Sequence, residues 1–414
     1  MEKSKINYTP KIFSPRAESS IGGLGLPIQV GGSGAKQGEV WNWGSDNLFP
    51  LALSLLSRCS TTHRRIINDK ADYISGAGFS LPDEAIRTKA FVEEANSQGE
   101  SLRQVLNKLA FDKCLFGNAF VEVVTDSAHS FLALFHQDAS RCRLAKDSGR
   151  VVLHHDWTRY QRSEAVSVPL YPLFEQGADG NLHTMIHYKD YEPMFSHYGV
   201  PPYIAGMNVS TIAYKTDNWN ISRLDNSFQL SGVMLLDGGV ESEEEAEKLA
   251  AAAQRKFSGK PGQVMFMVKE CDDGDNSRFI PITSTNEGDW RELHDQATGD
   301  IVIAHSWFRS LSGLDYAGGF SSERILHEWE VALNTVILGE QEELMEPIRS
   351  LVSTILGEDG SRLEIVNRPP SRSKPLYMRV WEARKADGLD YDPTNPEEQY
   401  YVAQVTKYGL KNVD

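Results

Sequence analysis

Two long helical stretches that bracket a short segment of different pattern constrain the fold of this chain more than any other feature. Residues 203–228 and 286–308 contain no proline. At 1.5 Å per residue, the first stretch would form a rod of roughly 40 Å. Residues at helical spacing along one face of this stretch are mixed, with apolar side chains such as Ile204 and Met207 and polar ones such as Ser222. Such a mixed face is typical of a helix that contacts neighbours on several sides. The pattern therefore predicts a chain that packs against other chains.

The segment between the two rods, residues 229–285, has the pattern of a compact αβ module. Ser242–Glu245 matches a capping box with acidic residues in the first helical turn, and Arg255–Lys256 suit the last turn of the same helix. Val264–Val268 and Arg278–Ile282 then follow the strand pattern. We expect a small separate insert with the order strand, helix, strand, strand.

A mixed α+β region precedes the first rod, and a long helix follows the second. Before the rods, the periodicity predicts helices from Leu48, over 60–75, 83–97 and 101–116, and strands over 120–124, 131–135, 166–174 and 183–191. After them come a glycine-containing break at 309–321, a helix over 321–356, a strand over 363–366 and a helix over 396–407. Pro347 should bend the long helix.

Composition bounds the class of protein. The chain has 414 residues, of which 40% are hydrophobic and 24% charged, so two or three folded units are expected. A net charge of −15 disfavours a protein that coats DNA, because such a surface repels a polyanion. Four widely spaced cysteines indicate neither a disulfide framework nor a zinc knuckle, and a reducing compartment fits. A signal peptide and a membrane span are not expected.

Several segments resemble catalytic or metal-binding motifs but lack required residues. Gly32–Gln37 lacks the Gly-Lys-Ser/Thr order of a phosphate loop, and His327–Val331 lacks the second histidine of a zinc-protease helix. Asp272–Asn276 lacks the glycine and glutamate of a calcium loop. His63–Arg65 and His154–His155 could bind phosphate, with a solvated helix end and an exposed strand as the alternatives. We therefore expect no catalytic residue, no metal site and no cofactor.

The order of these elements resembles the portal proteins of tailed double-stranded-DNA bacteriophages. Short local sequences over about 45–360 strengthen the resemblance, namely Tyr198–Tyr203, Leu224–Gly232, Lys256–Val264, Ile301–Phe308, Glu323–Leu338 and Thr62–Phe79. It implies an α+β portal fold that forms a ring. The implied parts are an N-terminal arm (1–44), a wing (45–202), a first stem helix (203–228), a clip (229–285), a second stem helix (286–308), a tunnel loop (309–321), a long spine helix (322–358) and a C-terminal wing strand with a short crown (359–414).

The resemblance also implies a function. A portal is a homo-oligomeric ring, usually a dodecamer, at one capsid vertex of the virion. It is a channel for packaging, retention and ejection of double-stranded DNA. The implied partners are the major capsid protein, the large terminase subunit and the head–tail adaptor, with assembly in the host cytoplasm and no membrane contact. Another ring-shaped head–tail connector, or the portal of a prophage or gene-transfer particle, is the alternative.

By the same resemblance, three groups of residues are expected to serve the channel. The second stem helix would face DNA with Glu287, Asp289, Glu292, Asp295 and Asp300, and a ring of acids repels phosphates and leaves the duplex free to slide. The tunnel loop would present Leu311, Gly313, Leu314, Asp315, Tyr316, Gly318 and Gly319. The clip would dock its partners through Glu243, Glu244, Glu247, Asp272 and Asp273.

Overall fold

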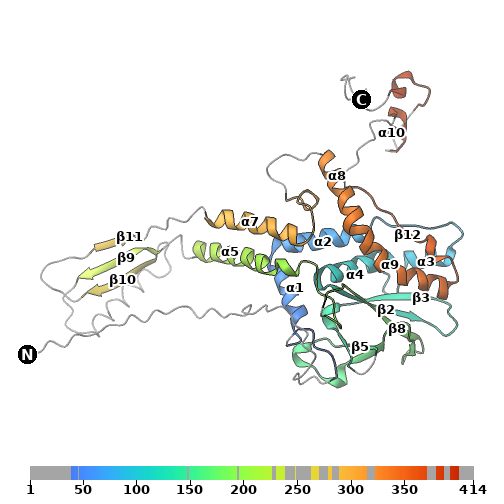
Figure 1. The fold of residues 1–414 in the computed structure, drawn as a ribbon, viewed down its shortest axis with the longest axis horizontal. Coiled ribbons are helices and arrows are strands. Elements are labelled where there is room, and N and C mark those ends of the chain that lie inside the picture. The colour runs from blue at the N-terminus through green and yellow to red at the C-terminus, as the bar shows by residue number, and fades with distance from the viewer. Residues whose placement is uncertain are drawn as a thin grey trace, which may run out of the picture.

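A folded body carries a stem of two helices with a small sheet at its tip (Figure 1). The computed structural model describes residues 39–44, 46–146, 149–193, 195–225, 230–237, 248, 263–269, 278–281, 289–314, 322–370, 379–386 and 392–400. Among these residues no helix combines the length and the apolar character that a membrane crossing requires.

In the body, the helices α1 (Phe49–Cys59), α2 (Thr61–Ser75) and α3 (Ile86–Glu93) pack around α4 (Leu102–Phe116). Local sequence sets their ends. Ser60 caps α2 by accepting from the His63 N–H, and Ser101 with Gln104 forms a capping box at α4. Gly117 ends α4 with a left-handed backbone (φ 65°), which glycine adopts without a steric penalty.

An antiparallel sheet in the order β3–β2–β8–β7 packs against α4. Its strands are β2 (Asn118–Thr125), β3 (Leu132–Gln137), β7 (Glu175–Gln176) and β8 (Leu182–Lys189). Val121 pairs with Ile186 and Val123 with Leu134, and these side chains belong to the main core. β2 is therefore a central strand of the core, buried along its whole length except at the half-buried Glu122.

A second sheet, with β4 (Cys142–Leu144), β5 (Arg150–Leu153) and β6 (Val166–Pro169), forms the lower part of the body. Short helical turns lie beside it, η1 (Ala139–Arg141), η2 (Trp157–Arg159) and η3 (Arg162–Glu164). The buried Arg143 donates from Nε to Asn47 Oδ1 at 2.5 Å and from Nη2 to the Asn47 carbonyl at 2.8 Å. These bonds fasten the segment before α1 to this sheet.

The stem consists of α5 (Met207–Asp225), which follows the short turn η4 (Ile204–Gly206), and α7 (Asp289–Ala304). The two helices lie side by side along their length (Figure 1). A Cβ added at Gly206 would lie 2.4 Å from Ala304 Cβ, so glycine is what allows this close approach at the base of the stem.

A three-stranded sheet at the tip of the stem joins β9 (Leu230–Asp237), β10 (Gln263–Lys269) and β11 (Arg278–Pro281). β9 lies in the centre, with β10 parallel and β11 antiparallel to it. These strands fall where the sequence predicts the strands of the insert. The predicted helix that begins at Ser242 lies almost wholly outside the described residues.

A continuous helical run, drawn in orange in Figure 1, leads from above the body into its core. It comprises α8 (Ser322–Ala332), the π-helical segment η6 (Leu333–Ile337), α9 (Leu338–Leu351) with Pro347 inside it, and a second π-helical segment, η7 (Val352–Leu356). After the turn η8 (Gly360–Arg362), β12 (Glu364–Ile365) pairs with β1 (Phe79–Ser80). The last described elements are α10 (Val380–Ala386) and η9 (Pro396–Gln399).

The structure corrects several predicted boundaries. The helix predicted over 286–308 ends at Ala304, because Ser306 has a positive φ of 49° that an α-helix cannot continue through. The helix predicted over 83–97 covers only Ile86–Glu93. The helix predicted over 396–407 begins as a 3₁₀ turn and otherwise lies outside the described residues, whereas α10 was not predicted.

Candidate functional site

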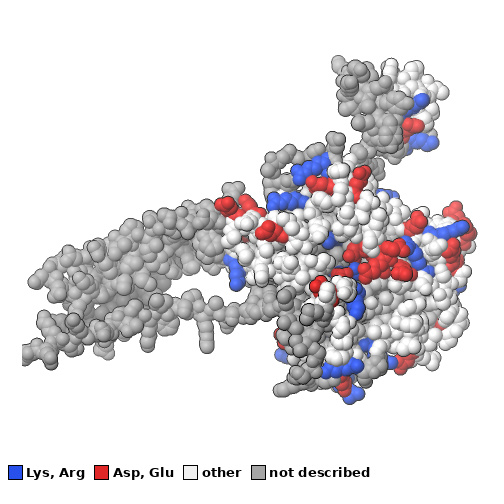
Figure 2. Space-filling view, viewed as in Figure 1, with Lys and Arg blue, Asp and Glu red and all other residues white. Residues whose placement is uncertain are grey.

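The acidic residues predicted for the second stem helix share one face of α7. Glu292, Asp295 and Asp300 are exposed, whereas Ala297 and Ile301 are buried. At 3.6 residues per turn the three acids, together with the backbone position of Asp289, fall within less than half of the helix circumference, and Ile301 lies opposite. Figure 2 shows acidic side chains over this helix. Glu287 lies outside the described residues.

Two features of this face were not predicted. Ile303 is 75% exposed on the same side of α7 as the acids. The guanidinium of Arg309 lies against Gly299, since a Cβ added there would be 2.5 Å from Arg309 Nη2. The acidic face therefore ends near the body with an apolar residue and a basic one, which the spacing of acids alone did not indicate.

The predicted tunnel loop begins inside the body. Residues Ser310–Ser312 form a 3₁₀ turn (η5) whose side chains are buried, and Trp307 Nε1–H donates to Ser312 Oγ at 3.0 Å. Leu311 is therefore a core residue, and its assignment to a loop that projects into a channel is wrong. Gly313 ends the turn with φ 67°, and Leu314 packs against the core.

The rest of the predicted loop and docking residues cannot be placed. Asp315, Tyr316, Gly318 and Gly319 of the loop lie outside the described residues. The same holds for Glu243, Glu244, Glu247, Asp272 and Asp273 of the predicted docking surface.

A buried histidine pair joins the base of the stem to the body. His63 Nδ1 of α2 lies 2.8 Å from Nε2 of His305, the residue after α7, and Lys70 Nζ donates to the His305 carbonyl at 3.0 Å. The ring of Tyr203, just before η4, stacks on His305 at 4.8 Å between centroids. Burial, and then the charge of Arg64, lower the pKa of His63 to about 4. Burial, His63 and Lys70 hold the pKa of His305 well below its usual range.

Both histidines are therefore neutral at pH 7. The sequence marks His63–Arg65 as a possible phosphate site or a solvated helix end, but His63 is fully buried. Its neutral ring serves the packing of the stem instead of binding an anion.

A buried lysine joins three elements of the body. Lys113 Nζ of α4 lies 2.6 Å from Asp190 Oδ1, 2.6 Å from Glu340 Oε2 and 3.0 Å from Glu343 Oε2. Burial alone would lower the pKa of Lys113, but Asp190 and Glu340 raise it well above its usual range. Burial raises the pKa of Asp190 to about 6 against the opposing effect of Lys113. The acidic area where α4 meets α9 is visible in Figure 2.

This cluster connects the start of α9 to α4 and to the segment after β8, and the three carboxylates already share the lysine ammonium. Nothing in the local sequence around Lys113 pointed to it, because its partners lie 77 and 227 residues away.

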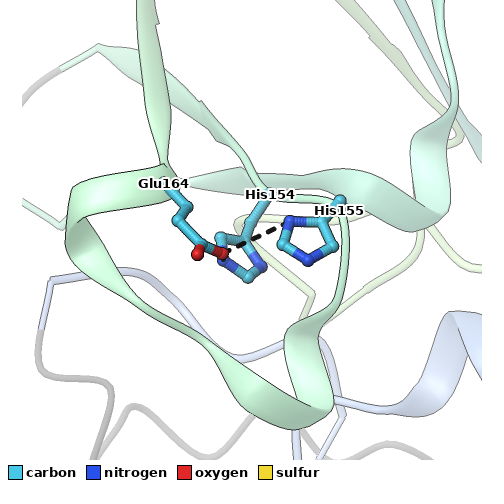
Figure 3. Close-up of side chains that lie close together, drawn as sticks. All are labelled: His154, His155 and Glu164. Atoms are coloured by element: carbon cyan, nitrogen blue, oxygen red, sulfur yellow. Dashed lines mark ion pairs between the residues drawn. The ribbon is translucent and has the colours of Figure 1, made fainter.

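A second cluster joins His154, His155 and Glu164 beside η3 (Figure 3). Glu164 Oε2 lies 3.7 Å from His154 Nε2 and 3.7 Å from His155 Nδ1. The Asp156 N–H donates to His154 Nδ1 at 3.1 Å, and the Gln161 N–H faces His154 Nε2 at 3.3 Å. A neutral imidazole has a single acceptor lone pair, so this ring has none left for a metal ion. The Glu164 carboxylate also disfavours the phosphate interpretation.

The sequence of this chain is similar to a known protein family and to a protein of known sequence. Residues 87–272, from α3 to beyond β10, match the family model described as phage portal protein, which confirms the resemblance drawn from the sequence. A protein of Rickettsia felis described as uncharacterized is 23% identical over 257 residues, which cover 61% of this chain and 62% of that protein. The chain thus matches less than two thirds of the length of this curated relative.

Solved structures share the fold. A chain from the neck of an empty gene transfer agent particle, computed with C6 symmetry, superposes with a TM-score of 0.54 at 14% identity and covers 83% of this chain and 94% of that one. A chain from the neck of the native particle, computed with C12 symmetry, gives 0.53 at 15% identity and covers 84% and 95%. At this level of identity the likeness establishes a common mixed helix-and-sheet fold.

Proposed function

We propose that this chain, a member of the phage portal family, is one subunit of a homo-oligomeric ring that forms the DNA channel at one capsid vertex. The observation that carries the proposal is the acidic face of α7. Glu292, Asp295 and Asp300 are exposed on the side of α7 opposite the buried Ile301, and α7 packs against α5 and α2. Repeated around an axis, this face would surround a duplex with carboxylates.

Such an acidic lining would let DNA pass through the channel and would disfavour binding of the DNA to the channel wall. Each duplex phosphate would be repelled from every wall, so the free energy of the DNA would be lowest on the axis. Lysine or arginine in the same positions would bind phosphates and release counterions, which would hold the DNA in place. The channel role thus accounts for an acidic stem in a protein that acts on a polyanion.

Exposed apolar side chains on the stem helix α5 and on α1 of the body support lateral contacts between subunits. Ile212 and Ile221 of α5 are 39% and 54% exposed, and their nine-residue spacing puts them on opposite sides of the helix. Leu51 and Leu55, one turn apart on α1, are 46% and 48% exposed. A closed ring needs two different contact faces on each subunit, and α5 offers an apolar residue on each side.

The proposed ring has twelve subunits. The neck structures with C6 and C12 symmetry support a closed ring for a chain of this fold. In the virion, the ring would contact the major capsid protein at its vertex, after assembly in the host cytoplasm. The portal family is structural, which supports a role without catalysis.

We assign the docking of the large terminase subunit, and later of the head–tail adaptor, to residues 229–285 at the tip of the stem. The described strands of this segment, β9, β10 and β11, lie at the far end of the stem from the body (Figure 1), where they would be accessible in a ring. Deletion of residues 229–285 should abolish terminase binding while leaving the body folded. Terminase binding by the shortened protein would refute this assignment.

A portal of a gene transfer particle is the second candidate, because the two neck structures come from such particles. The ring, the acidic lining and the stem contacts would be the same. The sequence of the DNA in purified particles separates the two, since a phage packages its own genome and a gene transfer particle packages host DNA.

Native mass spectrometry of the purified protein, followed by imaging of the particles, tests the ring. We expect a complex of twelve copies with a central hole lined by residues 289–304. A compact monomer at high protein concentration, or a ring in which residues 289–304 lie away from the hole, would overturn the proposal.

A further inference from the structure

The outer face of the main sheet carries a groove that the portal function does not use. The cavity has a volume of about 550 Å³, within the usual range for ligand pockets. Its floor consists of side chains from one face of β2, β3 and β8, and its rims are the loop after α3 and the turn before β8. Its lining includes Glu94, Glu122, Val124, Phe131, Phe135, Asp179 and His183.

The groove is both acidic and aromatic. Among the described residues that line it, three are acids and none is a lysine or an arginine. The basic group among them is His183, whose ring nitrogens lie 2.8 Å from Glu122 Oε1 and 2.9 Å from Asp179 Oδ1. Burial opposes its charge, but these two carboxylates outweigh burial and raise the pKa of His183. Even with His183 protonated, the groove keeps a negative charge.

The apolar part of the groove is open to solvent. Phe131 is 37% exposed at the rim, and Phe135 is half-buried on the floor beside Val124. Exposed aromatic rings next to carboxylates suit a ligand that alternates apolar and cationic side chains, because the rings accept both kinds of contact.

The chain itself contains such a segment. Lys3–Arg16 has four basic residues, Lys3, Lys5, Lys11 and Arg16, and no acidic one, although the whole chain has a net charge of −15. Ile6, Tyr8, Ile12 and Phe13 stand between these basic residues. The segment lies outside the described residues, and the first described residue is Glu39.

The segment can reach the groove. Residues 17–38 separate it from the body, and at about 3.3 Å per residue this connection spans up to about 70 Å. The body would be roughly 45 Å across if it contains about 250 residues. Because the segment and the groove belong to one chain, this connection keeps the segment at a high effective concentration near the groove.

We propose that residues 3–16 of this chain dock in the groove on β2, β3 and β8, with their basic side chains on its carboxylates and their apolar side chains on Phe131 and Phe135. The docked segment would cover the outer face of the sheet. The proposed docking involves neither the DNA channel nor the tip of the stem, so it can be tested independently of the portal function.

Limited proteolysis of the full-length protein tests the docking, because trypsin cleaves after Lys11 and Arg16 only when the segment is free. We expect slow cleavage in the wild type and roughly tenfold faster cleavage in the double variant Glu94→Lys with Phe131→Ser. Glu93→Lys is the matched control, since Glu93 is an exposed neighbour that does not line the groove. Cleavage in the control should stay at the wild-type rate.

Carbodiimide cross-linking of the full-length wild type gives a second readout that does not depend on a variant. We expect amide links from Lys3, Lys5 or Lys11 to Glu94 or Asp179, and fewer of them at high salt. Thermal unfolding checks that each variant keeps its fold. Equal cleavage rates in the wild type and the double variant, or no cross-link from the segment to the groove, would overturn the proposal.

Discussion

His63 Nδ1 lies 2.8 Å from His305 Nε2 although 242 residues separate the two histidines. One ring must donate and the other accept, so the bond is lost once both rings are protonated. The charged groups next to it, Arg64 and Lys70, are both cationic. A proton added to either ring would therefore meet positive charge and the cost of burial, at the point where the stem meets the body.

This pair should make the protein unstable in acid. Because the pKa of His63 falls from about 6.5 to about 4 on folding, the unfolded chain binds the proton first. The associated stability is complete above pH 6.5 and is lost as the pH falls towards 4. Each histidine should contribute a slope of up to about 1.4 kcal/mol per pH unit in the free energy of unfolding.

Urea unfolding between pH 4.5 and 7.5 measures that slope. The double variant His63→Phe with His305→Leu should reduce the slope, because both partners of the bond become apolar, and His187, whose pKa burial lowers to about 3, should account for part of the slope that remains. The control His129→Asn changes an exposed histidine with a positive φ that asparagine tolerates, and it should keep the wild-type slope. An unchanged slope in the double variant would show that the pair does not titrate as described.

Lys113→Met should destabilise the body strongly. The substitution leaves the carboxylates of Asp190, Glu340 and Glu343 without their shared cation, and breaking a buried ion pair in this way costs about 3–5 kcal/mol. Lys108→Met on the same helix is the control, because its pair with Glu100 is exposed and should cost no more than about 1 kcal/mol. Chemical denaturation of both variants compares them, and similar losses would contradict the role given to Lys113.

Gly206→Ala should force the stem helices apart at their base. The new methyl group would lie 2.4 Å from Ala304 Cβ, and overpacking of this kind costs about 1–3 kcal/mol. Gly339→Ala, at an exposed helical position with no neighbour within 4 Å, should instead stabilise the helix by about 1 kcal/mol. The melting temperatures should move in opposite directions, and a loss in both variants would count against the stem contact.

Neutralising the acidic face of α7 should slow DNA passage without harming assembly. In the triple variant Glu292→Gln, Asp295→Asn, Asp300→Asn, the proposed lining loses its repulsion, so packaging should slow most at low salt. The triple variant Asp83→Asn, Glu93→Gln, Glu364→Gln removes the same charge from exposed positions on the body and should package at the normal rate. Equal packaging rates at all salt concentrations would rule out a channel role for this face.

The glycine-rich part of the predicted loop offers a further test. Gly318→Val with Gly319→Val should leave ring assembly intact and impair DNA packaging or retention, because valine restricts the backbone conformations that glycine permits. Gly313→Val is not a suitable substitute, since Gly313 closes the buried turn η5 with a positive φ. Normal packaging and retention by the double variant would argue against a loop that adjusts to the duplex.

The order of elements could be predicted from the sequence because it depends on local patterns. Ser60 and the Ser101–Gln104 capping box lie at the starts of α2 and α4, and Gly117 lies at the end of α4. The strand pattern of Val264–Val268 and the absence of proline in residues 203–228 likewise act between near neighbours. Periodicity and capping need no knowledge of the rest of the chain, so the two rods, the insert and the long helix were foreseeable.

The tertiary structure alone decided which polar groups became buried and what they contact. From the local sequence, Lys113 and His63 would be expected on the surfaces of their helices. In the fold they are buried, because Glu340 and His305, which are distant in the sequence, pack against them. Leu311 looked like a loop residue, but the body folds over it. A charged or hydrogen-bonding group is buried only where partners form hydrogen bonds or ion pairs with it. Local sequence patterns do not show which distant residues will be those partners. Local pattern thus specified the elements of this protein, and packing specified the contacts that hold the stem to the body.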